Sequence, residues 1–438
     1  MTRERSFWRF VPYRMRELPT LIAVITVVLM TVSVARAQTL TTLYSFCAQP
    51  ACTDGTSPQS KLVQDANGNL YGTTLFGGAA NDGTVYKIST TGQYTILHSF
   101  CTEPTCLDGR VPYAGLVMGA DGNLYGATSQ DGGPNSGGTL FKLTLSGTLT
   151  TLHRFVCTVS NCPEGSGPSS LMQASNGDFY GTTEIGTSAA PSGRIFKFTG
   201  AGKLTTLYVF CTETGIYCAT GENPNAPLVE AKNGDFYGTT YGGGEYGFGT
   251  VFRITPQGTL TSLHSFCAEG SEVCPDGQSP SGGLVRASNG DFYGTTSLVG
   301  GTVYKITPTG KLTTLVNFCT ESPCPDGTQP SAGLIQATDG NLYGATGYGG
   351  ANGFSGTIFQ LTLNGTLTTL YSFCTEPGCP DGSHPFTTLM QGHDGDLYGT
   401  TYYGGADNSG TVFSFSLPPG SIVRALPTSG SAESPVGL

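Results

Sequence analysis

The sequence lacks the features by which many enzymes and helical proteins are recognised. No long stretch places apolar residues at i, i+3, i+4 and i+7, so amphipathic helices are excluded as the main element. No nucleophile elbow, phosphate-binding loop or zinc-ligand spacing is present. The 438 residues instead include 65 Gly, with many Thr, Tyr, Phe and Val, which is typical of short strands and tight turns. We therefore predict an all-β protein, and we assign no catalytic residue, no metal ligand and no cofactor.

Basic residues are few, and six of the 20 lie in the first 37 residues. Arginines at positions 3, 5, 9, 14 and 16 precede an apolar run over 21–34 and the segment Ala35-Arg36-Ala37. This order predicts a secretory signal peptide over 1–37, removed on export, and hence a secreted or cell-surface protein. An uncleaved membrane anchor is the alternative, although the run is shorter than the roughly 20 residues that span a bilayer. No other stretch is a candidate membrane span.

Removal of residues 1–37 leaves an acidic protein. That segment carries six Arg and two Glu of the chain's 20 basic and 30 acidic residues, so 14 basic and 28 acidic residues remain, a net charge of −14. This balance argues against nucleic acid, or an anionic membrane surface, as the partner. Residues 418–438 are rich in Pro, Gly and Ser, and we predict that they form a disordered tail.

One six-residue motif occurs seven times. It reads Asn or Asp, Leu or Phe, Tyr, Gly, Thr or Ala, Thr, and its copies lie at 69–74, 123–128, 178–183, 235–240, 291–296, 341–346 and 396–401. The steps between copies are 50 to 57 residues. A period this regular indicates a repeat architecture.

Each repeat predicts four short strands, named A, B, C and D here, and the motif is strand B. Strands A are expected at 61–66, 115–120, 170–175, 227–232, 283–288, 333–338 and 388–393, strands C at 83–88, 138–143, 193–198, 249–254, 301–306, 356–361 and 410–415, and strands D at 39–46, 93–100, 148–155, 203–210, 259–266, 311–318 and 366–373. Only Asn-Gly or Asp-Gly separates A from B, which favours a type I′ hairpin. The C–D connections, such as 255–258 and 307–310, suit a type I turn followed by a left-handed Gly.

Four antiparallel strands per repeat predict one blade of a β-propeller. A parallel β-helix has shorter coils, and a linear array of domains does not account for the chain ends. The first element, 39–46, is a lone D strand, and the last repeat, 388–415, lacks a D strand. We expect the N-terminal strand to pair with 410–415 and to close a seven-bladed ring over 38–417 without an open sheet edge. The Gly of each Tyr-Gly pair is interpreted as room for close packing of blades near the axis, with ligand contact as the alternative.

The fourteen cysteines form seven sequential pairs, one in each repeat. In an exported chain this even count predicts disulfides, and the periodicity favours pairing within each repeat. Two sulfurs per repeat are too few for a structural zinc site. The expected pairs are Cys47 with Cys52, Cys101 with Cys106, Cys157 with Cys162, Cys211 with Cys218, Cys267 with Cys274, Cys319 with Cys324, and Cys374 with Cys379.

The repeated motif, followed each time by G-T-V-Y/F-K-I and L-T-T-L-Y-S-F or close variants, resembles the GloVer (Gloeo/Verruco) tandem-repeat proteins over residues 39–417. This resemblance implies an exported bacterial β-propeller of the choice-of-anchor type, and it implies no functional residues. The segment ALPTSG at 425–430 resembles the start of an immunoglobulin-like module seen after such propellers. At the level of fold alone, the A–B hairpin resembles that of seven-bladed streptogramin-lyase-type propellers.

The expected topology places the D–A and B–C loops on one face and the tight A–B and C–D turns on the other. We predict that any ligand site lies on the loop face, around the axial mouth. Aromatic side chains in the B–C loops suggest stacking against carbohydrate or peptide, with packing over the loop bases as the alternative. The candidate ligand residues are Tyr241, Tyr246, Tyr348, Tyr402 and Tyr403.

Acidic residues recur after the second cysteine in six repeats: Asp54, Asp108, Glu164, Asp276, Asp326 and Asp381. Calcium binding is the alternative to turn capping, but no run matches Asp-x-Asp-x-Asp-Gly, so capping of their own turns is favoured. His98, His153 and His264 share a D-strand position with Tyr and Val, which indicates a structural role. His384 and His393 occur only in the last repeat. A His near Asp394 and Asp396 is a candidate general base. The alternative, which is favoured, is that the two acids belong to the hairpin turn and have no catalytic role.

The favoured function is that of a monomeric binding or scaffold module at or outside the cell envelope, with a carbohydrate or a protein at the cell surface as partner. The first alternative is a lyase or hydrolase acting on a polysaccharide or a cyclic ester. Such an enzyme needs non-repeating polar residues that converge at the axial mouth. The second alternative is a purely structural surface protein.

Overall fold

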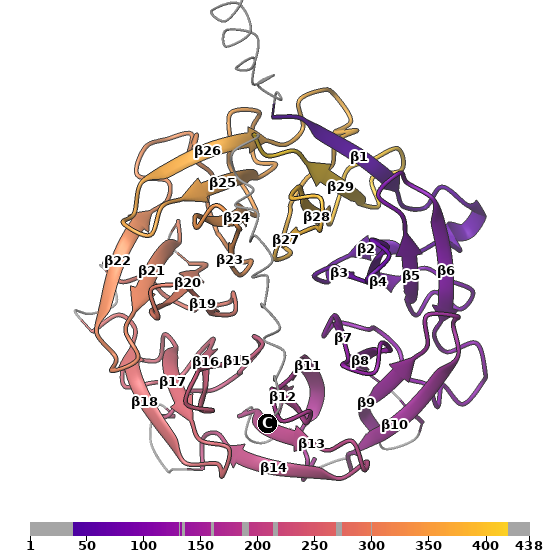
Figure 1. Cartoon of the computed structure of the whole chain (residues 1–438), viewed down its shortest axis with the longest axis horizontal. Coiled ribbons are helices and arrows are strands. Elements are labelled where there is room, and N and C mark those ends of the chain that lie inside the picture. The colour runs from indigo at the N-terminus through magenta and orange to yellow at the C-terminus, as the bar shows by residue number, and fades with distance from the viewer. Residues whose placement is uncertain are drawn as a thin grey trace, which may run out of the picture.

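Seven antiparallel sheets stand around a common axis, as the predicted propeller requires (Figure 1). The computed structural model describes residues 38–418 except 131, 134–135, 159–161, 186–191, 213–217, 269–273 and 299. The predicted signal peptide and nearly all of the predicted tail lie outside the described residues. Among the described residues, no helix is long and apolar enough to cross a membrane.

The strands of each blade run from the axis to the rim in the order A, B, C, D (Figure 1). Strands A are β3 (Val63–Gln64), β7 (Leu116–Met118), β11 (Ser166–Gln173), β15 (Val229–Glu230), β19 (Val285–Arg286), β23 (Ile335–Gln336) and β27 (Met390–Gln391). Strands B are β4 (Leu70–Phe76), β8 (Leu124–Thr128), β12 (Phe179–Ile185), β16 (Phe236–Thr240), β20 (Phe292–Thr296), β24 (Leu342–Thr346) and β28 (Leu397–Thr401).

The outer half of each blade is more regular. Strands C are β5 (Thr84–Ile88), β9 (Ser136–Leu143), β13 (Arg194–Phe198), β17 (Thr250–Ile254), β21 (Thr302–Ile306), β25 (Thr357–Leu361) and β29 (Thr411–Phe415). Strands D are β6 (Tyr94–Ser99), β10 (Leu149–Val156), β14 (Leu204–Val209), β18 (Leu260–Ser265), β22 (Leu312–Asn317), β26 (Leu367–Ser372) and β1 (Leu40–Ser45). A short strand, β2 (Thr56–Pro58), and one 3₁₀ turn, η1 (Pro50–Cys52), lie before β3.

Most A strands are shorter than predicted, because side chains replace part of their ladder. Five of the seven have only two paired residues. In the first blade, the backbone N–H of Thr73 donates to the hydroxyl of Ser60 at 2.9 Å instead of to a strand carbonyl. The innermost strand therefore leaves the sheet early, and its preceding residues face the axis.

The A–B connection is not the predicted type I′ turn. Gly68 has a φ of +86°, but no Asn or Asp that precedes Gly in these hairpins has a positive φ. The N–H of Gly68 donates to the carbonyl of Asp65 at 3.0 Å, and the N–H of Asp65 donates to the carbonyl of Asn69 at 2.9 Å. This is a type I turn closed by a left-handed Gly, the geometry predicted and found at the C–D turns. The Asn or Asp before Gly is selected for a different reason: in six hairpins its side chain accepts the N–H two residues later.

The Gly of each Tyr-Gly pair makes room inside its own blade, so the interpretation as room between blades was wrong. A methyl group on Gly344 would collide with the ring of Phe359, its cross-strand partner, and with Leu334 of the same blade. The equivalent Gly in each of the other six blades faces the same aromatic position on strand C. The ring covers the gap that Gly leaves in strand B, and this pairing pins the register of the two strands.

Blades pack against one another through apolar side chains on both faces. In one cluster Tyr343 and Ile358 of the sixth blade meet Leu397 and Phe413 of the seventh. In three blades the Tyr of the repeated motif also lies against an aromatic ring of the next blade, as Tyr237 does on Phe292, with ring centroids 4.1 Å apart. The apolar character of alternate and adjacent strand residues follows from this two-sided burial.

The N-terminal strand closes the ring as predicted. β1 pairs antiparallel with β29, from Leu40 opposite Phe415 to Ser45 opposite Thr411 (Figure 1). The N–H of Phe46 continues the pairing to the carbonyl of Gly410 at 3.0 Å. Residues from the two ends of the propeller therefore share one sheet.

Closure does not remove every sheet edge, contrary to the prediction, because each D strand borders the rim. A register shift in all seven C–D pairs leaves one Leu of strand D without a partner on strand C, such as Leu43 between Thr42 and Tyr44. A bulge bends an edge strand and makes it a poor template for pairing with another chain.

Candidate functional site

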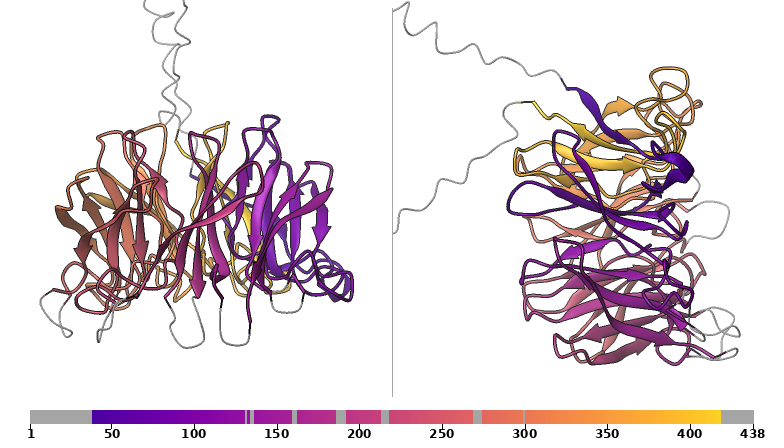
Figure 2. Two further views of the ribbon diagram at one scale, coloured as in Figure 1. Left: turned by 90° about the horizontal axis from the view of Figure 1, so that it is seen from below. Right: turned by 90° about the vertical axis from the view of Figure 1, so that its right-hand side faces the viewer.

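The loop face carries seven disulfides, and each joins the two cysteines of one repeat, as predicted. The bonds are Cys47 to Cys52, Cys101 to Cys106, Cys157 to Cys162, Cys211 to Cys218, Cys267 to Cys274, Cys319 to Cys324, and Cys374 to Cys379. Figure 2 shows the blades edge-on, with the strands running between the two faces. Each bond links residues five or seven positions apart, directly after a D strand. The disulfides thus hold the start of each D–A connection, which goes on to the axis.

Each of these cysteines is bonded to the other cysteine of its repeat. Among the described residues there is no free cysteine. Both groups of possible metal ligands in the described part of the chain contain a disulfide pair, whose sulfurs are not available as thiolates.

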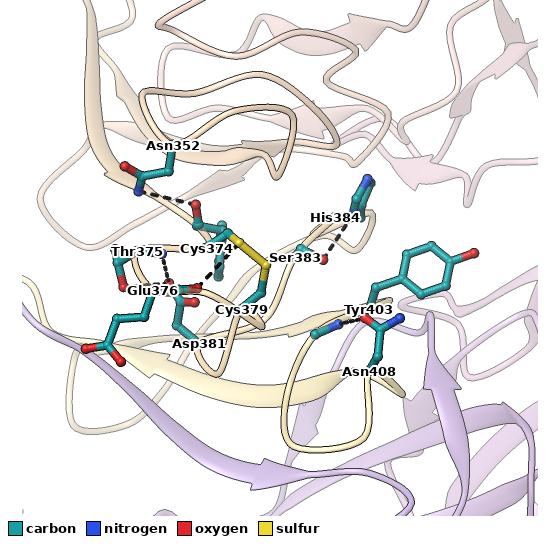
Figure 3. The surroundings of a disulfide bond; sticks show 12 residues. Asn352, Cys374, Thr375, Glu376, Cys379, Asp381, Ser383, His384, Tyr403 and Asn408 are labelled. Carbon is teal, nitrogen blue, oxygen red and sulfur yellow. Dashed lines mark hydrogen bonds between the residues drawn. A yellow bond between two sulfur atoms is a disulfide. The ribbon is translucent and has the colours of Figure 1, made fainter.

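Five of the six recurring acids accept an N–H group at the start of the cysteine loop, and the Asp326 side chain accepts, among the described residues, only the hydroxyl of Thr369, at 3.1 Å. Asp381 accepts the N–H of Thr375 at 3.3 Å (Figure 3). It also accepts the hydroxyl of Tyr371, on the preceding D strand, at 2.7 Å. The three D-strand histidines take the place of that Tyr, and their Nε2 atoms lie 2.8 to 3.0 Å from the carboxylates. These pairs are His98–Asp108, His153–Glu164 and His264–Asp276. The prediction that these acids cap their own turns was therefore wrong, because the hydrogen bonds that they accept come from the cysteine loops and the D strands.

The buried tyrosines predict an alkaline limit to stability. Burial, and then the hydrogen bond to Asp381, raises the pKa of Tyr371 from 10.0 to about 12, and the same causes raise the pKa of Tyr44 and Tyr343. Because the folded pKa lies above the unfolded one, the stabilising effect is complete below pH 10 and is lost as the pH rises from about 10 to about 12. Guanidinium unfolding across that range is expected to show falling stability, and Tyr371→Phe is expected to be less stable at pH 8 but to lose less on alkalisation. A steeper alkaline loss in the variant contradicts this assignment.

Each D–A loop has, at an equivalent position near the axis, one residue with a left-handed backbone conformation, and a Pro follows it. The seven left-handed residues have φ values of 53° to 61°, and they are Ser57, Val111, Gly167, Asn223, Ser279, Gln329 and His384. The following Pro packs on the Gly that opens strand C of the preceding blade, as Pro385 does on Gly356. The N–H of His384 donates to the carbonyl of Ser355, also in the preceding blade, at 2.8 Å. Main-chain contacts between blades therefore fix this loop whatever its side chains are.

The residue after that Pro forms a ring around the axial mouth, which we name the mouth ring. Its members are Gln59, Tyr113, Ser169, Asn225, Ser281, Ser331 and Phe386. Six of the seven line a cavity of about 340 Å³, together with Tyr241, Ser297, Leu298, Gln329 and Tyr348. The frame repeats almost without change while this ring varies, so the side chains at the mouth differ from blade to blade.

The cavity offers aromatic faces and hydrogen-bonding groups without a charge among its lining residues. Asn225 Oδ1 and Ser331 Oγ are buried and have no hydrogen-bond partner. Ser281 Oγ donates to the carbonyl of Ser331 at 3.3 Å, which links neighbouring blades at the mouth. Burial, and then the charge of Glu184, raises the pKa of Tyr113. Buried polar groups normally find partners, so these two oxygens are unsatisfied polar atoms of residues that line the cavity.

The predicted ligand residues divide into two sets. Tyr241 and Tyr348 line the mouth cavity. Tyr402 does not line the cavity, and its ring centroid is 6.1 Å from that of Phe386, which does. Tyr403 packs edge-on against His384, with ring centroids 5.4 Å apart. Tyr246 lies next to Glu245, whose charge raises the Tyr246 pKa, and it does not line the cavity. The sequence analysis missed the mouth ring, whose signal is the Pro that precedes one variable residue in every D–A loop.

The remaining histidines do not form the candidate acid–base site. The carboxylate of Asp394 accepts the hydroxyl of Tyr398 at 2.6 Å and the N–H of Asp396 at 3.2 Å, which accounts for it as a turn residue beside His393. His384 lies on the other face, where Nδ1 is 3.1 Å from Ser383 Oγ and burial lowers its pKa (Figure 3).

A family model decides the relationship of this chain. The model described as the Gloeobacter/Verrucomicrobia repeat matches three tandem segments, 28–167, 156–321 and 272–434. The chain belongs to the Gloeobacter/Verrucomicrobia repeat family. In this Gloeobacter/Verrucomicrobia repeat protein, the Gly, Pro and Cys positions that recur from blade to blade make the contacts of the frame. No protein with a curated description matches this sequence.

Solved structures share the fold of this Gloeobacter/Verrucomicrobia repeat protein at low identity. The extracellular domain of BT4673 from B. thetaiotaomicron, proposed to be a hybrid two-component system, matches with a TM-score of 0.54 and 13% identity over 86% of this chain and 40% of that chain. The corresponding domain of BT3049 from the same organism has a TM-score of 0.54 and 15% identity over 86% of this chain and 41% of that chain. The chain thus spans about two fifths of the length of these structures.

Proposed function

We propose that this protein is an exported binding module that holds an uncharged, hydroxyl-rich ligand, an oligosaccharide, at the axial mouth of its loop face. The observation that carries the proposal is the mouth cavity itself, where aromatic rings stand beside two buried oxygens without partners. Aromatic faces stack on the apolar faces of sugar rings, and amide and hydroxyl groups bond to sugar hydroxyls.

Three further observations support this assignment. The chain carries a formal net charge of −10, which disfavours anionic polymers as ligands. Seven disulfides fit an oxidising compartment outside the cytosol. The similar propellers from B. thetaiotaomicron are extracellular domains. The described residues that line the cavity include no carboxylate and no imidazole, so binding is favoured over hydrolysis.

The test is an array of neutral, acidic and basic polysaccharides and cell-wall fragments, probed with the oxidised protein and read for retention and for released product. Retention of neutral glycans without product supports the proposal. Release of product overturns it in favour of a lyase or hydrolase, and retention of charged glycans alone overturns the ligand class.

Variants at the mouth sharpen the test. Tyr241→Ala and Tyr348→Ala are each expected to weaken binding of the retained glycan by about tenfold, since loss of one stacking ring costs on the order of 1 kcal/mol beyond the lost buried area. Tyr246→Ala is the matched control, because this Tyr occupies the same loop as Tyr241 without lining the cavity. Equal loss in all three variants, measured by isothermal titration calorimetry, contradicts the placement of the site.

A further inference from the structure

The outer rim holds a second cavity, larger than the one at the axial mouth. It has a volume of about 630 Å³ and opens between β18 of the fourth blade and β22 of the fifth. Its lining residues are His264, Ala268, Pro275, Asp276, Leu312, Thr314 and Asn317. We refer to it as the rim groove.

One wall of the rim groove is a fixed imidazole. His264 Nε2 lies 2.8 Å from Asp276 Oδ2, and the N–H of Cys267 donates to both oxygens of that carboxylate at 3.1 and 3.2 Å. The side chains of His264 and Asp276 are 23% and 15% exposed, so the imidazole presents a limited face to the groove. The carboxylate is satisfied by protein donors and orients the ring.

The same place between the seventh and first blades is occupied by a side chain of the protein itself. There Tyr44 stands where His264 stands, and its hydroxyl donates to Asp54 at 2.7 Å, as His264 pairs with Asp276. Tyr94, at the first position of β6, stacks on Tyr44 with ring centroids 4.1 Å apart and planes 8° from parallel. The hydroxyl of Tyr94 donates to the main-chain carbonyl of Asp54.

The rim groove has residues equivalent to those around Tyr94, but it has no phenol ring at the position of Tyr94. Leu312, at the first position of β22, corresponds to Tyr94, and Ala268 and Asp276 correspond to Ala48 and Asp54. Leu312 packs against the core cluster that contains Phe266 and Tyr304, and it has no ring to stack on the imidazole as Tyr94 stacks on Tyr44. The ring of Tyr94 therefore shows which group fits beside such a wall.

We propose that the rim groove binds a phenol ring, which stacks on His264 as Tyr94 stacks on Tyr44. The ring lies flat against the imidazole, and its hydroxyl is directed to the main chain at Asp276. The chemistry is the same for a free phenolic compound and for the tyrosyl side chain of a partner protein. This site is separate from the axial mouth, so it stands whether or not the mouth binds carbohydrate.

The experiment follows the imidazole NMR signals of the full oxidised chain during titration with p-cresol. The five histidines give few signals, and His264→Gln assigns the relevant one. We expect saturable shifts of the His264 signals with p-cresol and none with 4-methylcyclohexanol, which has the same size but no planar ring. A second titration with N-acetyl-tyrosinamide separates the sources: a response to both compounds indicates a tyrosyl side chain, and a response to p-cresol alone indicates a free phenol. No response to either compound, or an equal response to 4-methylcyclohexanol, overturns the proposal.

Two variants exchange the residues at the equivalent positions 312 and 94, using the stack of Tyr94 on Tyr44 as the reference arrangement. Leu312→Tyr installs the arrangement of the first blade and is expected to weaken p-cresol binding by about tenfold or more, because the new ring fills the site. Leu367→Tyr, the same substitution at the equivalent position of another blade, is the control and is expected to leave the His264 response unchanged. Tyr94→Leu empties the other junction and is expected to open a further p-cresol site, detected by ligand-observed NMR. If Leu312→Tyr folds and binds p-cresol as tightly as the parent, the ring does not occupy the rim groove.

Discussion

Reduction of the seven disulfides is expected to unfold the protein at 37 °C. Each bond closes a short loop, with the two cysteines five or seven positions apart, so in the chain-entropy model it contributes roughly 2 kcal/mol. Seven such contributions, on the order of 15 kcal/mol if they add, equal or exceed the whole stability of a typical domain, about 5–15 kcal/mol. The loops also hold the acids that bond the D strands, so their release removes further contacts.

Thermal and guanidinium unfolding with and without a reductant measure this effect. The graded control is the double variant that combines Cys211→Ser with Cys218→Ser, which removes one bond and is expected to lose about 2 kcal/mol, with the fold retained. A reduced protein whose unfolding midpoint matches that of the oxidised protein would show that the cysteine loops contribute little to stability.

Deletion of residues 38–46 is expected to abolish the folded monomer. The deletion removes β1, which supplies five paired residues to β29, and the fully buried Phe46. Truncation of a buried Phe alone costs about 3–5 kcal/mol. The loss of β1 also exposes the edge of β29, which carries no bulge and pairs along its whole length with β28, so it becomes a template for association.

Size-exclusion chromatography and thermal unfolding test the deletion, with two single variants as references. Phe46→Ala is expected to lose about 3–5 kcal/mol as a monomer. Thr41→Ala, an exposed residue of the same strand, is expected to change stability by less than about 0.5 kcal/mol. A stable monomeric deletion variant contradicts the closure of the ring by β1.

The fold could be predicted because several independent features of the repeats indicate the same architecture. The period, the Gly-containing turns and the unmatched D strand at the N-terminus together specify a closed ring of blades. The approximate ranges of strands B, C and D were also predictable, since the same segments recur in every repeat. The even cysteine count in an exported chain predicted disulfides, and the period favoured the pairing within each repeat that the structure has.

The errors in the prediction concern geometry that the one-dimensional pattern does not contain. Asn67-Gly68 is compatible with two hairpin types, and the backbone pairing of Asp65 with Asn69, not the dipeptide, decides between them. The Gly at 344 fits packing within or between blades, and only the register opposite Phe359 assigns it to its own blade. Phe386 and Ser331 have no sequence signal in common except the Pro before each, so the sequence does not predict that both line the mouth cavity.

The left-handed residue and Pro that open each mouth-ring position have a consequence for how such a protein diversifies. Because the contacts that hold this loop are made by the main chain and the Pro ring, a change at the next residue leaves the scaffold intact. Six of the seven repeats thus contribute one variable side chain to the surface that lines the mouth cavity. Single substitutions at these positions can therefore change the binding surface without changing the fold. A library randomised at Gln59, Tyr113, Asn225, Ser281, Ser331 and Phe386 would sample new binding specificities on an unchanged scaffold.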